Sequence, residues 1–160
     1  MDGRPMSFHK IFIFMGLYFF PMTGRAEVLG TWPFDGSQPA TITISTAQLP
    51  GSTSKEPPRA SDRRAMRLII RIDSDEKKWL RGIESVTVQA NMPQHEHGML
   101  VTPKPSIKIK DGVFAIDGVQ FHMEGEWLLL VRTQHAAHGI YAKKSNANTI
   151  QINISSLKKE

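Results

Sequence analysis

The residues best suited to metal chemistry lie in one short stretch, 91–99, where two histidines flank a glutamate and a methionine follows. Imidazole nitrogen beside thioether sulfur is a ligand set that favours copper, and Cu(I) above Zn(II) or Mg(II). If this stretch is extended, His95, His97 and Met99 point the same way, because alternate residues of a strand share a face. The spacing therefore predicts three copper ligands close together.

A fourth ligand could come from the downstream pair His122 and Met123. In a strand over 119–123 these two side chains face opposite ways, and Met123 shares the phase of the apolar Val119. We therefore expect Met123 in the core and His122 on the surface, where it could bind metal. Met92 is the other candidate, although it continues the apolar phase of its strand and also fits a core position.

The same residues have an explanation without metal. His95 and His97 can equally be hydrogen-bonding residues that shape a turn, since Pro93 removes a backbone donor and ends the strand. His135 and His138 form a second spaced pair in an expected loop, and they rank below the first cluster as ligands. Both interpretations of the cluster stay open at this point.

Three common sequence signatures of enzymes are absent. There is no Gly-x-Ser-x-Gly elbow and no phosphate-binding Gly-x-x-x-x-Gly-Lys loop. Four positions after His95, where the helix of a zinc protease carries its second histidine, stands Met99. The chain has no cysteine, which excludes thiol chemistry, disulfides and a disulfide-linked partner. These observations predict a non-catalytic protein.

The N-terminal segment is typical of a signal peptide. A basic start precedes the apolar run 11–20, which is too short to cross a bilayer comfortably. Small residues then occupy the two positions that a signal peptidase reads, so cleavage is expected before Glu27. We expect residues 1–26 to form a signal helix and 27–160 to be a single domain in the periplasm or outside the cell. An uncleaved N-terminal membrane anchor is the alternative.

The charge of the chain is mildly basic. It carries 20 Lys and Arg against 15 Asp and Glu, and removal of 1–26 leaves 17 against 14, a net charge of +3. Basic residues are scattered and aromatic residues are few, so neither a nucleic-acid partner nor an amphipathic membrane helix is indicated. We interpret most of these charges as a solvated surface.

Apolar and polar residues alternate with a period of two through most of the remaining chain, which indicates strands. We expect strands over 41–46, 66–72, 83–92, 106–110, 113–116, 119–123, 126–134 and 149–155.

The segments between these strands carry turn and loop signals. Asp111-Gly112 predicts a hairpin, and the polar stretch 49–64 predicts a long exposed loop. Residues 30–39 are expected to be irregular. In the polar connection that follows residue 72, Trp79 and Leu80 are expected to fold back as a hydrophobic plug. With no convincing amphipathic helix, the pattern predicts an all-β antiparallel sandwich of about seven strands, either immunoglobulin-like or cupredoxin-like.

About a quarter of the chain resembles the signature region of the YtkA-like and FixH-like proteins. The shared residues are Met92-Pro93, His95-x-His97-Gly98-Met99, Pro103, Asp111-Gly112, Gly118, Phe121-His122-Met123, Gly125 and Trp127. The resemblance implies an immunoglobulin-like sandwich in the cell envelope, often linked to copper or cytochrome oxidase handling. Glu96 departs from the family's pattern, since many relatives have a small residue there.

Together these observations lead to two hypotheses. In the first, the protein is a non-catalytic envelope protein that binds or delivers copper through His95, His97 and Met99, with His122 or Met92 completing the set. Its partner would then be a membrane protein or another copper-handling protein. In the second, the same motif only folds a loop of a structural or interaction module that binds no metal.

Overall fold

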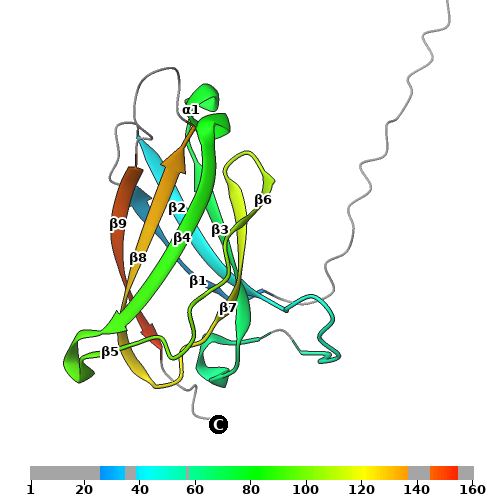
Figure 1. Cartoon of the computed structure of the whole chain (residues 1–160), viewed down its shortest axis with the longest axis vertical. Coiled ribbons are helices and arrows are strands. Elements are labelled where there is room, and N and C mark those ends of the chain that lie inside the picture. Colours follow the sequence, from blue (N-terminus) through cyan, green and yellow to red (C-terminus); the bar gives the residue numbers. More distant parts are fainter. Residues whose placement is uncertain (1–25, 35–38, 57, 137–144, 155–160) are drawn as a thin grey trace, which may run out of the picture.

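Two antiparallel sheets face each other in the computed structural model, which describes residues 26–34, 39–56, 58–136 and 145–154 (Figure 1). The strands are β1 (Val28–Phe34), β2 (Ala40–Ala47), β3 (Met66–Asp73), β4 (Ile83–Met92), β5 (His97–Gly98), β6 (Ile107–Lys110), β7 (Val113–Val119), β8 (Gly125–His135) and β9 (Ser145–Ile154). The larger sheet has the order β1-β2-β3-β7-β6, and the smaller has the order β5-β4-β8-β9. The expected all-β sandwich is confirmed.

The strand order selects between the two expected topologies. The series β2-β3-β7-β6 matches the A-B-E-D sheet of an immunoglobulin constant-type domain, and β4-β8-β9 matches its C-F-G sheet. β1 adds a strand outside β2, and β5 adds a short strand outside β4. The arrangement is therefore immunoglobulin-like.

The core lies between the sheets and follows the predicted alternation. Leu68 and Ile70 of β3 and Val86 and Val88 of β4 are all buried in one hydrophobic cluster. Trp127 of β8 is the largest fully buried side chain among the described residues. Burying one aliphatic side chain contributes roughly 1.5–3 kcal/mol, which lets a chain without disulfides fold on apolar burial.

Two strand predictions are wrong. Residues 28–34 form a strand, β1, where the sequence predicts irregular structure over 30–39; the register shift between Val28 and Gly30 interrupts its alternation. The strand expected over 119–123 is absent, because Val119 is the last residue of β7 and residues 120–123 cross to the other sheet.

The polar connection between β3 and β4 also differs from the expectation, because it contains a short helix, α1 (Lys77–Gly82). The expected hydrophobic plug is present within this helix. Leu80 is buried, and the ring of Trp79 meets that of Phe34 edge-on at 5.6 Å.

The long loop 49–64 is present, and its described part contains one short 3-10 helix, η1 (Ala60–Asp62). Apart from Ala26, the predicted signal peptide lies outside the described residues, as does Ser155 of the last expected strand.

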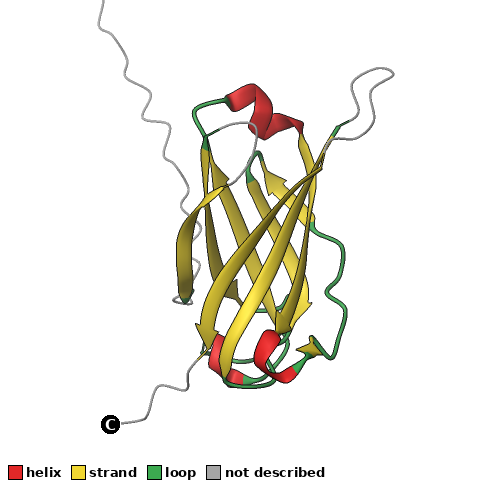
Figure 2. Cartoon of the chain, turned by 90° about the vertical axis from the view of Figure 1, so that its left-hand side faces the viewer, coloured by secondary structure: helices red, strands yellow, loops and turns green. Residues whose placement is uncertain are grey.

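The sandwich is elongated, with different elements at its two ends (Figure 1, Figure 2). One end carries α1 and the turn between β6 and β7. The other end carries η1, β5, the 3-10 helix η2 (Pro93–His95) and the connection from β7 to β8. The predicted metal ligands belong to this second end, which we call the histidine end.

Candidate functional site

The stretch from Met92 to Met99 is a tight hairpin and not an extended segment. β4 ends at Met92, η2 turns the chain, and β5 returns beside β4. Glu96 closes the turn in the left-handed region with φ 53°. Because η2 breaks the alternation, the expectation that His95, His97 and Met99 share one face by strand geometry is wrong for His95.

His97 is held opposite Met92. These two residues are Cα partners in the β4–β5 pair, and side chains of directly opposed residues lie on the same face with Cβ atoms about 4.5–5.5 Å apart. Met92 is 1% exposed, whereas His97 and His95 are both exposed. A buried thioether and a solvent-facing imidazole are thus neighbours at the rim of the core.

Met99 follows directly after β5 and stays attached to β4. Its backbone N–H donates to the carbonyl of Ala90 at 3.2 Å, and its half-buried side chain packs against the core. Met92 and Met99 therefore both contact the core beside the turn that carries His95 and His97. This position explains why both methionines suit packing as well as metal binding.

His122 lies in the connection between β7 and β8, and its environment differs from the expectation. The sequence predicts a surface residue, but His122 is half-buried, with its ring edge-on to Trp127 at 5.3 Å between centroids. Its Nδ1 atom is buried and has no hydrogen-bond partner in the described structure. An unsatisfied buried polar atom costs about 1–3 kcal/mol, so this nitrogen is a candidate ligand.

The connection that carries His122 is held in place on both sides of the histidine. Gln120 Nε2 donates to the backbone oxygen of Arg63 at 2.7 Å, and the Arg63 guanidinium pairs with Glu124 at 3.2 Å. The indole N–H of Trp127 donates to the backbone oxygen of Met123 at 3.1 Å. The side chain of Met123, expected in the core, is half-buried and packs against the core's edge.

Gly125 brings Met92 close to this loop. Its φ is 125°, and a Cβ atom placed on it would lie 2.9 Å from the terminal methyl carbon of Met92. Met92 therefore packs directly against the start of β8, near Trp127, on which His122 rests. All three residues belong to the region where β4 ends and β8 begins, and we call this region the corner of the histidine end; they are Met92, His122 and Trp127.

This corner offers donors of the kind that copper prefers. Within the described residues, no group of three or more His, Cys, Asp or Glu side chains is placed to hold a metal ion. Imidazole together with methionine sulfur is a ligand combination that favours Cu(I). The Nδ1 of His122, without a hydrogen-bond partner in the part of the chain that the structure describes, fits such a ligand set.

The second histidine pair does not add to this site. His135 is the last residue of β8, not a loop residue as expected, and its ring lies 5.2 Å from that of Trp79 in α1. His138 lies outside the described residues. His135 thus belongs to the end of the sandwich away from the proposed ligands.

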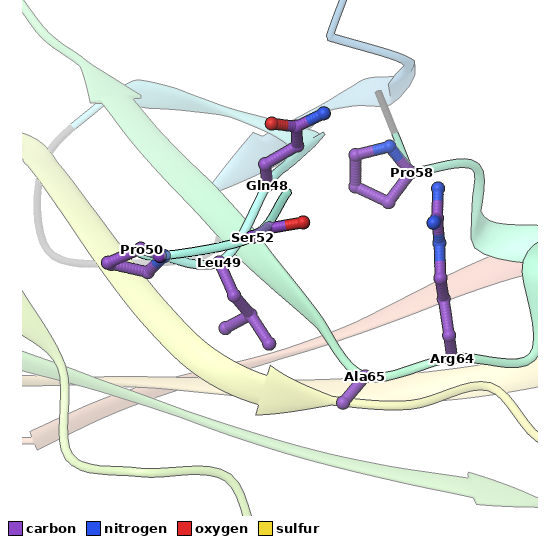
Figure 3. A pocket seen from close by; sticks show the side chains of 8 residues that line it. Gln48, Leu49, Pro50, Ser52, Pro58, Arg64 and Ala65 are labelled. Atoms are coloured by element: carbon purple, nitrogen blue, oxygen red, sulfur yellow. The ribbon is translucent and has the colours of Figure 1, made fainter. Parts of the chain in front are cut away.

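A cavity in the long loop offers little for catalysis. It measures about 250 Å³ and is lined by residues between β2 and β3, among them Gln48, Pro58 and Arg64 (Figure 3). Arg64 is the one charged side chain among the described residues of this lining, and its guanidinium is paired with Asp62 at 3.0 Å. The described lining therefore offers no base that could activate a nucleophile.

Within the described residues, no helix has the length and apolar character needed to cross a membrane. Comparisons of the chain with models of known families, with curated proteins and with solved structures found no match.

Proposed function

We propose that this protein is an exported, non-catalytic protein of the cell envelope that binds copper at the histidine end and delivers it to a partner. The observation that carries the proposal is the buried Nδ1 of His122, which has no hydrogen-bond partner among the described residues and lies where β4 ends and β8 begins. The resemblance to YtkA-like and FixH-like proteins points the same way.

The proposed ligands divide into packed and exposed groups. His122 and Met92 are held by packing, while His97, opposite Met92, is open to solvent and can receive the ion. Met99 supplies a second thioether from a half-buried position. His95 is exposed on η2 and adds an imidazole that needs a change in the turn to join the others. When bound, copper would crosslink the β4–β5 turn to the β7–β8 connection.

The proposed export is supported by the way Glu27 is anchored. Its backbone N–H donates to Thr46 Oγ1 at 3.2 Å, and its backbone oxygen accepts from Thr46 N at 2.8 Å. Its carboxylate accepts from the backbone N–H of Ala60 at 2.7 Å. Cleavage before Glu27 would thus leave a first residue that is already tied into the sandwich.

A second candidate function is an interaction module without metal. Leu100 and Val101 follow Met99 directly and are 72% and 51% exposed. Adjacent exposed apolar residues can mark contact with another protein. This surface suits a membrane partner in either case, and in the copper hypothesis it would bring the partner next to the ligands.

Copper titration of the purified protein separates the two functions. We expect stoichiometric binding of Cu(I), measured by competition with a chromogenic chelator, and weaker binding of Cu(II). His97→Ala is expected to abolish stoichiometric binding, and His95→Ala to weaken it. His122→Asn should also weaken binding, because the amide cannot replace the imidazole nitrogen as a copper ligand.

Two further variants separate loss of a ligand from indirect effects. Gln94→Ala alters an exposed residue of the same turn that is not a proposed ligand, and it should bind copper as the parent does. Met92→Leu keeps the core filled at a cost below about 1.5 kcal/mol and removes only the sulfur, so it should fold and bind Cu(I) more weakly. Binding no tighter than that of unrelated proteins, or equal binding by His97→Ala and Gln94→Ala, would exclude the copper hypothesis in favour of the interaction module.

A further inference from the structure

At the end of the sandwich away from the proposed copper ligands, a second cavity opens between α1 and the β6–β7 turn. It measures about 470 Å³. Its lining includes four cationic side chains and two anionic ones, which are Arg71, Lys77, Arg81 and Lys110, and Asp73 and Asp111. We call this cavity the basic pocket.

The two carboxylates of the basic pocket are already paired. Asp73 accepts from Arg71 Nε at 2.8 Å, and Asp111 pairs at 3.2 Å with the ammonium of Lys108, which lies outside the lining. The remaining cations of the lining have no carboxylate within ion-pair distance in the described structure; they are Lys77, Arg81 and Lys110. Three positive charges therefore remain around one cavity.

The cations come from elements that the fold holds in place. Arg81 is in the last turn of α1, which the buried Leu80 attaches to the core. Lys110 ends β6 at the hairpin turn, where the carbonyl of Gly112 accepts from the backbone N–H of Ile72 at 2.7 Å. Both α1 and the hairpin turn are thus fixed near the end of β3, and their cations line the same space.

Three apolar residues, Ile72, Leu80 and Val113, also line the pocket, and we call them its floor. Ile72 and Leu80 are buried, and Val113 is half-buried. A cavity of this volume is in the range of sites for small organic ligands and is larger than an inorganic oxyanion needs. A planar guanidinium with nearby ammonium groups binds phosphate oxygens well, and the floor can hold the rest of the molecule.

We propose that the basic pocket binds a phosphate ester, with the phosphate between Arg81 and Lys110 and the organic part on the floor formed by Ile72, Leu80 and Val113. The ester can be the headgroup of an anionic phospholipid or a soluble molecule, because both carry the same chemical group. The pocket is separate from the histidine end, so this binding is independent of copper.

The test is titration of the purified protein with phenyl phosphate and with inorganic phosphate, followed by calorimetry or by NMR shifts. Phenyl phosphate should bind more tightly than inorganic phosphate, because it adds contact with the apolar floor. Arg81→Gln and Lys110→Gln should each weaken phenyl phosphate binding about tenfold, the effect of losing one charge-assisted contact. Lys55→Gln, on the long exposed loop, removes the same charge outside the pocket and should change nothing.

Vesicle flotation then identifies the source of the phosphate. Flotation with phosphatidylglycerol vesicles but not phosphatidylcholine vesicles, lost in the Arg81→Gln/Lys110→Gln double variant, supports a lipid headgroup. Phenyl phosphate binding without flotation supports a soluble ester. The proposal is overturned if phenyl phosphate does not saturate the protein, or if Lys55→Gln weakens binding as much as Arg81→Gln. Because Lys110 lies outside α1, its variant keeps the test valid even where Arg81→Gln disturbs the helix.

Discussion

The Arg67–Asp117 pair of the larger sheet should stabilise the fold measurably. These residues are Cα partners in the β3–β7 ladder, and the guanidinium contacts both carboxylate oxygens, at 2.6 and 3.0 Å. Their side chains are 21% and 12% exposed. Removing one partner of a fully buried pair costs about 3–5 kcal/mol, and exposed pairs contribute about 0.2–1 kcal/mol. We therefore expect Asp117→Asn to lower the free energy of unfolding by about 2 kcal/mol, between these limits.

Strand β3 offers a matched control. Arg71 and Asp73 form an ion pair with a similar distance of 2.8 Å, but their side chains are 60% and 50% exposed. Asp73→Asn should therefore cost no more than about 0.5 kcal/mol. Urea unfolding followed by tryptophan fluorescence measures both costs, and a double-mutant cycle with Arg67→Met isolates the coupling between Arg67 and Asp117.

Acid should remove the difference between the parent and Asp117→Asn. The hydrogen bond from Arg67 lowers the pKa of Asp117 below its ordinary value; burial opposes this shift, and the charges of Arg67 and Lys104 add to it. A carboxyl group whose pKa is lowered by folding contributes stability above its unfolded pKa of about 3.9, and this stability is lost as the pH falls through the folded value. A cost of Asp117→Asn no larger than that of Asp73→Asn, or one that does not diminish in acid, would contradict a stabilising role of the Arg67–Asp117 pair.

Two further predictions concern the backbone and its anchors, and the same urea assay measures both. Gly112→Ala should destabilise the fold by more than about 2 kcal/mol, because φ is +73° and a Cβ atom would collide with the backbone oxygen of Ile72. Gly51→Ala, at φ +80° in open space, should cost about 1–2 kcal/mol. Thr46→Val should cost about 2 kcal/mol, because the buried Thr46 hydroxyl donates to Pro58 O at 2.6 Å and accepts from Glu27 N. Thr43→Val, on the same strand with an exposed hydroxyl bond, should be nearly neutral, and equal costs would contradict the role of Thr46.

The alternation of apolar and polar residues predicted best those strands in which alternate side chains are buried and the others face solvent. β3 and β4 begin where expected, and their buried residues are those that the period of two selects. β1 was missed because Gly30 and Pro33 are typical of loops, and its register shift spoils the alternation. Its existence depends on pairing with β2, a contact that the local pattern of β1 does not encode.

For the candidate site, the sequence likewise identified the residues but not their orientations, which depend on the fold around them. The sequence singled out His97, Met99 and His122, but the predicted orientations assumed extended chain throughout. η2 takes His95 out of phase, and the connection after Val119 places the ring of His122 against Trp127. Strand periodicity does not extend into a crossover between sheets, so the partial burial of His122 could not be predicted.

The pairing of β4 with β8 places the turn that carries His95 and His97 and the connection that carries His122 at the same end of the sandwich. β4 and β8 are antiparallel neighbours, with Asn91 opposite Leu128, so the chain that leaves β4 must lie beside the chain that enters β8. The same pairing sets Ile83 opposite His135, which places α1, just before β4, at the far end of the same strands. The β4–β8 ladder therefore separates the proposed copper site from the basic pocket, and a variant that perturbs one site should leave ligand binding at the other unchanged.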